Sequence, residues 1–209
     1  SWSRTRSGVV SQLIILIVLT NRSKCMLIGI AGTFGAGKGA VTEYLKQKGF
    51  VQYSSSAMLG ELVEKDGNPR TRNFLGPMAT KLQEKYPGGV VEKNYQEKYL
   101  DETPKDAIFE ALHRQSEANF LKSVGGIIIG IDADLDTRYK RTQLRNEGEK
   151  DQKSFDDFKE MSRIEEEGGG DKNWDNNIRA VLDMADHTIM NNGTVEELYA
   201  QVEEFLRQV

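Results

Sequence analysis

Cysteine is rare in this sequence, and an excess of positive charge is missing from it. Cys25 is the single cysteine among 209 residues, which excludes an intrachain disulfide and indicates a reducing compartment. Lys and Arg number 28 against 32 Asp and Glu, a formal net charge of −4. General binding to nucleic acid requires a basic surface and is therefore not expected. The remaining composition, 38% hydrophobic and 29% charged, is typical of a globular protein, which we expect in the cytoplasm.

A hydrophobic run long enough to cross a bilayer is also lacking. The longest one, 9–20 (VVSQLIILIVLT), is shorter than the roughly 20 residues that a spanning helix needs. It follows a charged start, as in a signal peptide, but polar residues stand where a small-residue cleavage site would be. Met26 immediately precedes the first convincing strand. We therefore expect 1–25 to be a non-native or disordered extension, with a targeting signal or an extra strand or helix as alternatives, and no membrane contact unless 9–20 is a real anchor.

Short apolar runs alternate with longer amphipathic segments from Met26 to the end of the chain, and no internal repeat is found. This alternation is typical of a parallel sheet with crossover helices. We expect strands at 26–32, 50–55, 106–112, 126–134 and 186–192, and helices at 38–48, 56–65, 71–86, 90–101, 116–123, 176–185 and 194–209. The pattern predicts an α/β fold, a doubly wound, five-stranded parallel sheet in one domain over 26–209.

A glycine-rich turn joins the first strand to the first helix in LIGIAGTFGAGKGAV (27–41). The phosphate-loop pattern G-x-x-x-x-G-K-[ST] is met by Gly32, Gly37 and Lys38, but Gly39 stands where a hydroxyl residue normally contacts magnesium. In such a turn the backbone N–H groups form an anion nest, and the lysine reaches the β- and γ-phosphates. A turn that merely needs glycines is the weaker interpretation. The loop residues expected to bind the nucleotide are Gly32, Thr33, Phe34, Gly35, Ala36, Gly37, Lys38, Gly39 and Ala40.

The string GAGKG resembles the loop of nucleoside monophosphate kinases of the adenylate kinase type, which usually reads G-x-x-G-x-G-K-G-[TS]. Gly39 fits that loop, whereas Ala40 departs from it, because threonine or serine is usual there. The segment 184–206 (MADHTIMNNGTVEELYAQVEEFL) is similar to the end of dephospho-coenzyme A kinases. The resemblance implies a P-loop NTPase fold, ATP and Mg2+ as cofactors and a small phosphorylated acceptor. It also implies acceptor-binding helices at about 56–101 and a lid at about 135–172.

Candidate acceptor-binding residues follow the second and third strands. In the resembling kinases the acceptor lies under the helices after the second strand, where this sequence has the hydroxyl of Ser54 but no acid. Simple capping of the next helix is the alternative role for Ser54. Arg70, Arg72 and Arg114 present forked donors that suit an acceptor phosphate. Solvated loop arginines are the alternative for the first two.

One carboxylate is placed to serve the transfer chemistry. Glu110 lies at the end of a buried strand that faces the phosphate loop, whereas Asp106 lies at its start. A carboxylate in that position can hold the hydration shell of magnesium and orient an attacking oxygen. The sequence therefore predicts a catalytic role for Glu110, with the metal bound through water.

The lid candidate is the basic segment after the fourth strand. Arg138, Arg141 and Arg145 recur at i, i+3 and i+7 and share one helical face. Guanidinium groups stabilise the charge on a transferred phosphoryl group, so we expect catalytic roles for Arg138 and Arg141; a solvated face is the alternative. The polar section 146–171 is predicted to be a mobile cover. By resemblance, Asn192 in the Asn-Asn-Gly after the last strand frames the adenine ring.

These features favour an ATP-dependent phosphotransferase with a nucleotide-like acceptor. A nucleoside monophosphate kinase is the first hypothesis, and a dephospho-coenzyme A kinase is the alternative within the same class. A P-loop switch without kinase activity is the alternative from another class, because Ala40 replaces a hydroxyl and no acid lies near Ser54. A kinase needs Arg70, Arg72 and Arg114 for turnover, whereas a switch does not.

Overall fold

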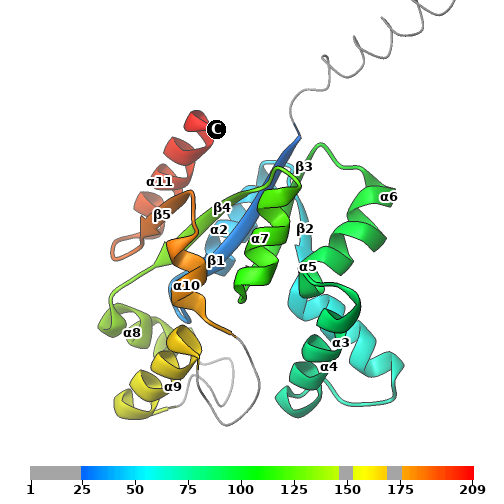
Figure 1. Ribbon diagram of the computed structural model, residues 1–209. Coiled ribbons are helices and arrows are strands. Elements are labelled where there is room, and N and C mark those ends of the chain that lie inside the picture. Colours follow the sequence, from blue (N-terminus) through cyan, green and yellow to red (C-terminus); the bar gives the residue numbers. More distant parts are fainter. Residues whose placement is uncertain (1–24, 146–152, 169–175) are drawn as a thin grey trace, which may run out of the picture.

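Five parallel strands form a single sheet in the computed structural model, which describes residues 25–145, 153–168 and 176–209. Along the sheet the order is β2-β3-β1-β4-β5. The strands are β1 (Met26–Gly32), β2 (Val51–Ser54), β3 (Asp106–Leu112), β4 (Ile127–Asp132) and β5 (His187–Met190). Helices cover both faces (Figure 1). The predicted doubly wound, five-stranded parallel sheet of a P-loop NTPase fold is thus confirmed, with β1 at the point where the strand order reverses.

The helices lie close to where the amphipathic pattern predicts them. Before β3 they are α2 (Lys38–Gln47), α3 (Ser55–Lys65), α4 (Arg72–Lys85), α5 (Gly89–Asn94), the π-helical η1 (Tyr95–Tyr99) and α6 (Leu100–Glu102). After β3 they are α7 (Gln115–Ser123), α8 (Leu135–Arg145), α9 (Phe155–Glu167), α10 (Ile178–Asp183) and α11 (Val195–Gln208). The single helix predicted over 90–101 is therefore three consecutive segments. Within the described residues no helix has the length and apolar character of a membrane span.

The core consists of two apolar layers, one on each face of the sheet. Successive side chains of a strand point to opposite faces. Ile28 and Ile30 accordingly pack with residues of α2 and α11, whereas Leu27 and Ala31 pack with residues of α5, α7 and α10. All four are buried. This double burial explains why β1 reads as an almost continuous apolar run.

Helix α9 is a difference from the sequence-based prediction, in which 146–171 is a mobile polar cover. The helix begins after Ser154, whose hydroxyl accepts a hydrogen bond from the Asp157 N–H at 3.2 Å. Its anchor is Phe158, fully buried and 6.0 Å from the ring of Phe34 in the phosphate loop. Because most residues of this helix are charged or polar, its few apolar positions are hard to identify from the sequence. Residues 1–24 of the predicted extension 1–25 and residues 146–152 and 169–172 of the predicted lid lie outside the described residues.

Candidate active site

The phosphate loop connects β1 to α2 at the carboxyl edge of the sheet. Gly35 and Gly37 have φ of 81° and 104°, conformations that favour glycine. A Cβ on Gly37 would lie 2.5 Å from the Asn191 amide nitrogen, which donates a 2.7 Å hydrogen bond to the Ala36 carbonyl. The end of β5 thus holds the loop closed. Because α2 begins directly after Gly37, its first N–H groups are directed at the loop and favour an anion.

Lys38 is folded over the loop that precedes it. Its ammonium group donates hydrogen bonds to the carbonyl oxygens of Gly32, at 2.6 Å, and Thr33, at 3.0 Å. Burial lowers the pKa of Lys38, and the carboxylates of Glu165 and Glu110 oppose that effect. The charges of an acid on β3 and of an acid on α9 therefore both act on the predicted phosphate-binding lysine.

The general phosphate-loop pattern has a hydroxyl residue at the position of Gly39, and the structure leaves free space for a side chain there. Gly39 is exposed, and a Cβ added to it meets no atom within 4 Å. Ala40 instead packs against the apolar layer under α2. Thr42 is buried one turn further along, and its hydroxyl has no hydrogen-bond partner among the described residues. Thr42 therefore belongs to the core side of α2 and does not replace the hydroxyl at the loop.

Gly39→Ser is expected to fold normally and to strengthen magnesium-dependent nucleotide binding several-fold. The serine fits the open space and supplies the missing hydroxyl, with a gain on the order of 1 kcal/mol for one net hydrogen bond. The measurement is ATP affinity by calorimetry as magnesium is titrated. Gly37→Ala is the comparison, because its Cβ would collide with Asn191 and lower the unfolding midpoint. Identical magnesium dependence in Gly39→Ser and wild type would contradict this prediction.

Glu110 occupies the position that the sequence predicts for a metal-supporting carboxylate. It is half-buried on β3, directly beside Ile30 of β1 and Ser54 of β2. The Gln52 amide nitrogen donates a 2.5 Å hydrogen bond to it. No three His, Cys, Asp or Glu side chains gather to hold a metal ion within the described residues. Magnesium in phosphoryl-transfer sites is commonly held by one or two carboxylates and by the phosphates themselves, so a single carboxylate fits this ion.

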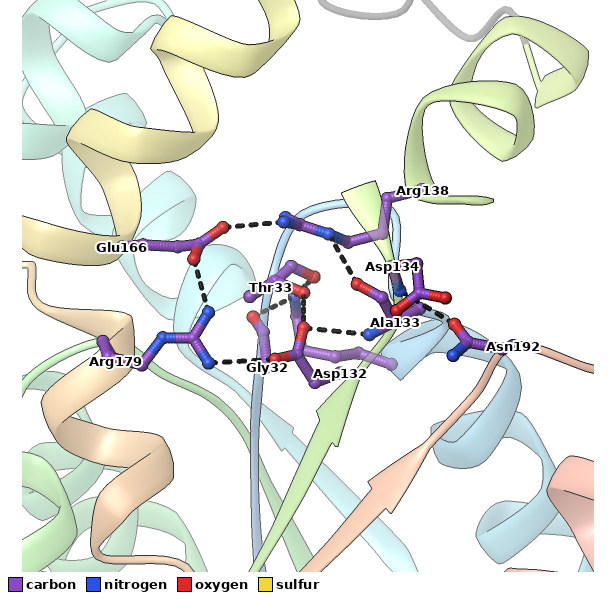
Figure 2. A network of polar contacts seen from close by, with 10 residues as sticks. Gly32, Thr33, Asp132, Ala133, Asp134, Arg138, Glu166, Arg179 and Asn192 are labelled. Carbon is purple, nitrogen blue, oxygen red and sulfur yellow. Dashed lines mark hydrogen bonds and ion pairs between the residues drawn. The ribbon is translucent and has the colours of Figure 1, made fainter. Parts of the chain in front are cut away.

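Arg138 is the most deeply buried arginine of α8, with 5% of its surface exposed. Its Nε donates to the Ala133 carbonyl at 3.0 Å, and its Nη2 pairs with Glu166 of α9 at 2.9 Å (Figure 2). Its Nη1 is buried, and none of the described residues supplies an acceptor for it. A buried donor without a partner is costly. Arg138 is therefore equipped to receive an oxygen of a bound anion.

The other two arginines of α8 also lie against the loops of the site. Arg141 donates to the carbonyl oxygens of Asn191, at 2.6 Å, and Gly193, at 3.0 Å. Burial lowers its pKa. The Arg145 guanidinium lies 5.3 Å from the ring centre of Phe34. The structure thus brings together the three arginines that the spacing placed on one face, while their catalytic roles stay a prediction.

Asn192 connects the segment after β5 to the segment that precedes α8. Its side-chain oxygen accepts a 2.8 Å hydrogen bond from the Asp134 N–H (Figure 2). The neighbouring Asn191, and not Asn192, contacts the phosphate loop. A role of Asn192 in framing adenine stays a prediction.

On the acceptor side, two of the predicted residues have local partners. The Ser54 hydroxyl accepts a 3.3 Å hydrogen bond from the Ala57 N–H and caps α3, as the alternative interpretation expected. Arg70 is exposed and pairs with Glu64 at 2.6 Å and 2.8 Å. The side chain of Arg72 lies outside what the structure describes. The acceptor-binding roles of these three residues stay predictions.

Arg114 differs from the other acceptor-side arginines because it is buried, with 4% exposed. It lies at the N-terminus of α7. Its Nε and Nη1 contact Asn176 Oδ1 at 3.4 Å and the Ala79 carbonyl at 3.5 Å. Both distances exceed those of strong hydrogen bonds. A buried guanidinium held by weak neutral acceptors would gain strongly from a phosphate, which supports the predicted role of Arg114.

Beneath Arg114 lies an acid that titrates near neutrality. Glu117 is 4% exposed and accepts hydrogen bonds from the backbone N–H groups of His113, at 2.9 Å, and Arg114, at 3.2 Å. Burial raises its pKa from 4.5 to about 7, although these N–H groups and the Arg114 charge oppose the shift. The Glu117 carboxyl group thus lies at the N-terminal end of α7, where burial disfavours its charged form.

The raised pKa of Glu117 predicts how stability depends on pH. Between pH 4.5 and about 7 the folded protein binds a proton that the unfolded chain has released, so this contribution to the free energy of unfolding falls as pH rises. The full loss corresponds to about 3 kcal/mol. Glu117→Gln keeps the acceptor oxygen and should flatten the pH dependence, as measured by urea unfolding at pH 5 and pH 8. A variant with the wild-type pH dependence would contradict the assignment.

Sequence reasoning missed a set of polar residues around Asp132. This aspartate ends β4 and is buried, with 8% exposed. It accepts hydrogen bonds from the Thr33 hydroxyl at 2.7 Å and the Ala133 N–H at 2.9 Å, and it pairs with Arg179 of α10 at 3.0 Å (Figure 2). Arg179 also pairs with Glu166 at 2.5 Å. Of these residues, only Asp132 could have been predicted from the sequence, because it is a carboxylate at the end of a strand that is expected in the same sheet as β1.

The fold and the loop geometry define a P-loop protein, with its ligand-binding edge at the carboxyl ends of β1, β3 and β4. A family model described as an AAA domain matches residues 28–168. The chain belongs to this family. The matched region runs from β1 through the phosphate loop to the end of α9.

Relatives among curated proteins cover almost the whole chain. A UPF0200 protein of Sulfurisphaera tokodaii is 28% identical over 187 residues, which cover 88% of this chain and 97% of that protein. A UPF0200 protein of Methanococcus maripaludis is 28% identical over 188 residues, with the same coverage. These names state no activity.

Solved structures with the same fold include small-molecule kinases. Shikimate kinase from Bacteroides thetaiotaomicron superposes with a TM-score of 0.54 at 14% identity, covering 87% of this chain and 98% of that one. Deoxyadenosine kinase from M. mycoides has a TM-score of 0.51 at 13% identity, covering 88% and 100%. At this level of identity the likeness concerns the fold alone.

Proposed function

We propose that this protein is an ATP- and magnesium-dependent phosphotransferase that acts on a small phosphorylated, nucleotide-like acceptor. One observation carries the proposal: the glycine-rich loop with Lys38 lies at the edge of the sheet where Glu110 of β3 and the buried Arg138 of α8 also lie. Transfer of a phosphoryl group requires mainly positioning and charge stabilisation, and this arrangement supplies both. The buried Nη1 of Arg138, for which the described part of the chain supplies no acceptor, supports a phosphate ligand. When bound, magnesium neutralises charge on the transferred phosphate.

Each residue has a defined part in this proposal. Lys38 and the loop N–H groups bind the donor phosphates, and Glu110 supports the metal through water and orients the attacking oxygen. Arg138 and Arg141 stabilise the transferred group and exclude water. Arg114 holds the acceptor phosphate, because among the described residues its buried guanidinium has only weak hydrogen bonds to neutral oxygens.

The acceptor that fits best is a nucleoside monophosphate, with dephospho-coenzyme A as the second candidate. The GAGKG loop favours the former, and the NNGTVEEL segment at the start of α11 favours the latter. The occurrence of kinases of small molecules and of nucleosides among proteins of this fold supports the class of reaction.

The decisive experiment measures ADP release by the purified chain with ATP, magnesium and a panel of nucleoside monophosphates plus dephospho-coenzyme A. ADP formation that depends on one acceptor would support the proposal and identify the substrate. Arg114→Gln is then expected to raise the KM for that acceptor at least about tenfold, the loss of one charge-assisted contact. Slow hydrolysis that is the same with every acceptor would overturn the kinase assignment in favour of a nucleotide-binding switch.

A further inference from the structure

Two arginines from different helices hold one carboxylate above the phosphate loop. Glu166, near the C-terminal end of α9, places its two oxygens on Arg138 Nη2, at 2.9 Å, and Arg179 Nη2, at 2.5 Å (Figure 2). The Arg138 and Glu166 side chains are 6% and 15% exposed. The contact between Arg138 and Glu166 is therefore largely shielded from water, whereas the Arg179 side chain is 47% exposed. Guanidinium groups bind carboxylate and phosphate oxygens with the same forked geometry.

The arginine pair is organised independently of Glu166. Arg138 is also fixed by the Ala133 carbonyl, and Arg179 is also fixed by Asp132, which in turn accepts the Thr33 hydroxyl of the phosphate loop. Each guanidinium group thus keeps a second partner if Glu166 moves away. Asp132 positions Arg179 next to the loop.

The arginine pair also has unused donor capacity, although Glu166 is present. The buried Nη1 of Arg138 has no acceptor among the described residues. A carboxylate offers two oxygens, and here both are already used by the two arginines. A phosphate offers a third oxygen. The ligand that satisfies this site more fully than Glu166 is thus a tetrahedral oxyanion.

A bound polyphosphate would also be repelled by the end of α9. Glu165, the neighbour of Glu166, raises the pKa of Lys38 through its charge and therefore lies near the phosphate-binding ammonium. Two consecutive carboxylates thus compensate the cationic site in the protein without ligand. They become unfavourable as soon as phosphate supplies the same charge.

We propose that Arg138 and Arg179 form a phosphate subsite of the loop, and that Glu166 is an internal competitor that occupies this subsite until a phosphate displaces it. The proposal rests on the proposed function for the identity of the ligand as a nucleotide phosphate. It adds Arg179 to the phosphate-binding residues and assigns Glu166 a role opposed to binding.

Titration calorimetry of the purified full chain with inorganic tripolyphosphate tests this directly. Glu166→Gln is expected to lower the Kd about tenfold, equivalent to about 1.4 kcal/mol. Glu167→Gln is the matched control, because Glu167 belongs to the same acidic end but pairs with the exposed Arg163. Its Kd should equal that of the wild type. An unchanged or weaker affinity of Glu166→Gln would overturn the proposal, as would an equal gain in the control.

Two further variants separate competition from a merely structural role of Glu166. Adding Arg179→Gln to Glu166→Gln should remove most of the gain, because the second arginine of the subsite is lost. Glu166→Asp keeps the charge but shortens the side chain, so it should give a smaller gain and provides the test if Glu166→Gln does not fold. A Glu166→Asp protein without any gain counts against the proposal.

The measured affinity for tripolyphosphate does not depend on catalysis. Tripolyphosphate binding needs neither an acceptor nor turnover. Tighter binding by Glu166→Gln without acceptor-dependent ADP release would overturn the proposed function and leave the subsite standing. An active kinase whose Glu166→Gln variant binds tripolyphosphate no better would overturn the subsite alone.

Discussion

Lys38→Ala is expected to abolish phosphoryl transfer, with a loss of about a thousandfold in kcat/KM. Lys38 is half-buried, and its ammonium group is anchored at the loop by the carbonyl oxygens of Gly32 and Thr33. It is thus pre-positioned for phosphate oxygens in a site of low dielectric, where one charge has a large effect. The measurement is coupled ADP release with the acceptor identified from the panel, together with ATP affinity by calorimetry.

The matched control for Lys38 lies on the same helix. Lys46 is exposed at the last turn of α2 and pairs with Glu43. Lys46→Ala removes the same charge without touching the loop and should leave kcat/KM and ATP affinity unchanged. A Lys38→Ala enzyme that retains wild-type turnover, with its circular dichroism and unfolding midpoint intact, would remove Lys38 from the active site.

Arg138→Ala should lower both stability and turnover. The substitution removes one of the two arginines that pair with the largely buried Glu166, and breaking such a buried pair costs about 3 kcal/mol. It also removes the guanidinium proposed to stabilise the transferred group, for which we expect about a hundredfold loss in kcat. Urea unfolding and steady-state kinetics measure the two effects separately.

Two companion variants make the Arg138 result specific. Arg138→Lys keeps the charge but not the forked donors, so it should recover more of the stability than of the turnover. Arg163→Ala breaks only exposed pairs with Glu160 and Glu167 and should leave the unfolding midpoint and kcat at wild-type values. If Arg138→Ala were as stable as the wild type, the pairing with Glu166 would not contribute to the fold.

The sequence was informative wherever structure depends on local periodicity. Leu27 to Ala31 alternate between the two faces of a doubly covered strand, so the apolar run alone predicts a buried parallel strand. The phosphate loop is equally local, because the left-handed turns at Gly35 and Gly37 and the start of α2 need only neighbouring residues. The order of strands and helices followed from the same reasoning.

Charge-rich segments were less predictable. The helical spacing of Arg138, Arg141 and Arg145 predicts that they share one face of a helix, but it does not predict their partners. Helix α9 was missed because its composition is polar, although Phe158 packs against Phe34 and fixes it over the loop. Two residues that the sequence suggests for acceptor binding have partners close by in the chain. Ser54 caps α3 through the Ala57 N–H, and Arg70 forms an ion pair with Glu64.

Short stretches of the sequence are enough to predict the individual strands, the phosphate loop with Lys38 and the carboxylate on β3, since each of these features depends on a few consecutive residues. The tertiary structure alone decided the polar network above the loop. Thr33 meets Asp132 across 99 positions of the chain, Arg179 meets Asp132 across 47, and Arg138 meets Glu166 of α9. No local pattern encodes such contacts, because they form only when β1, β4 and the helices that follow them converge at one edge of the sheet.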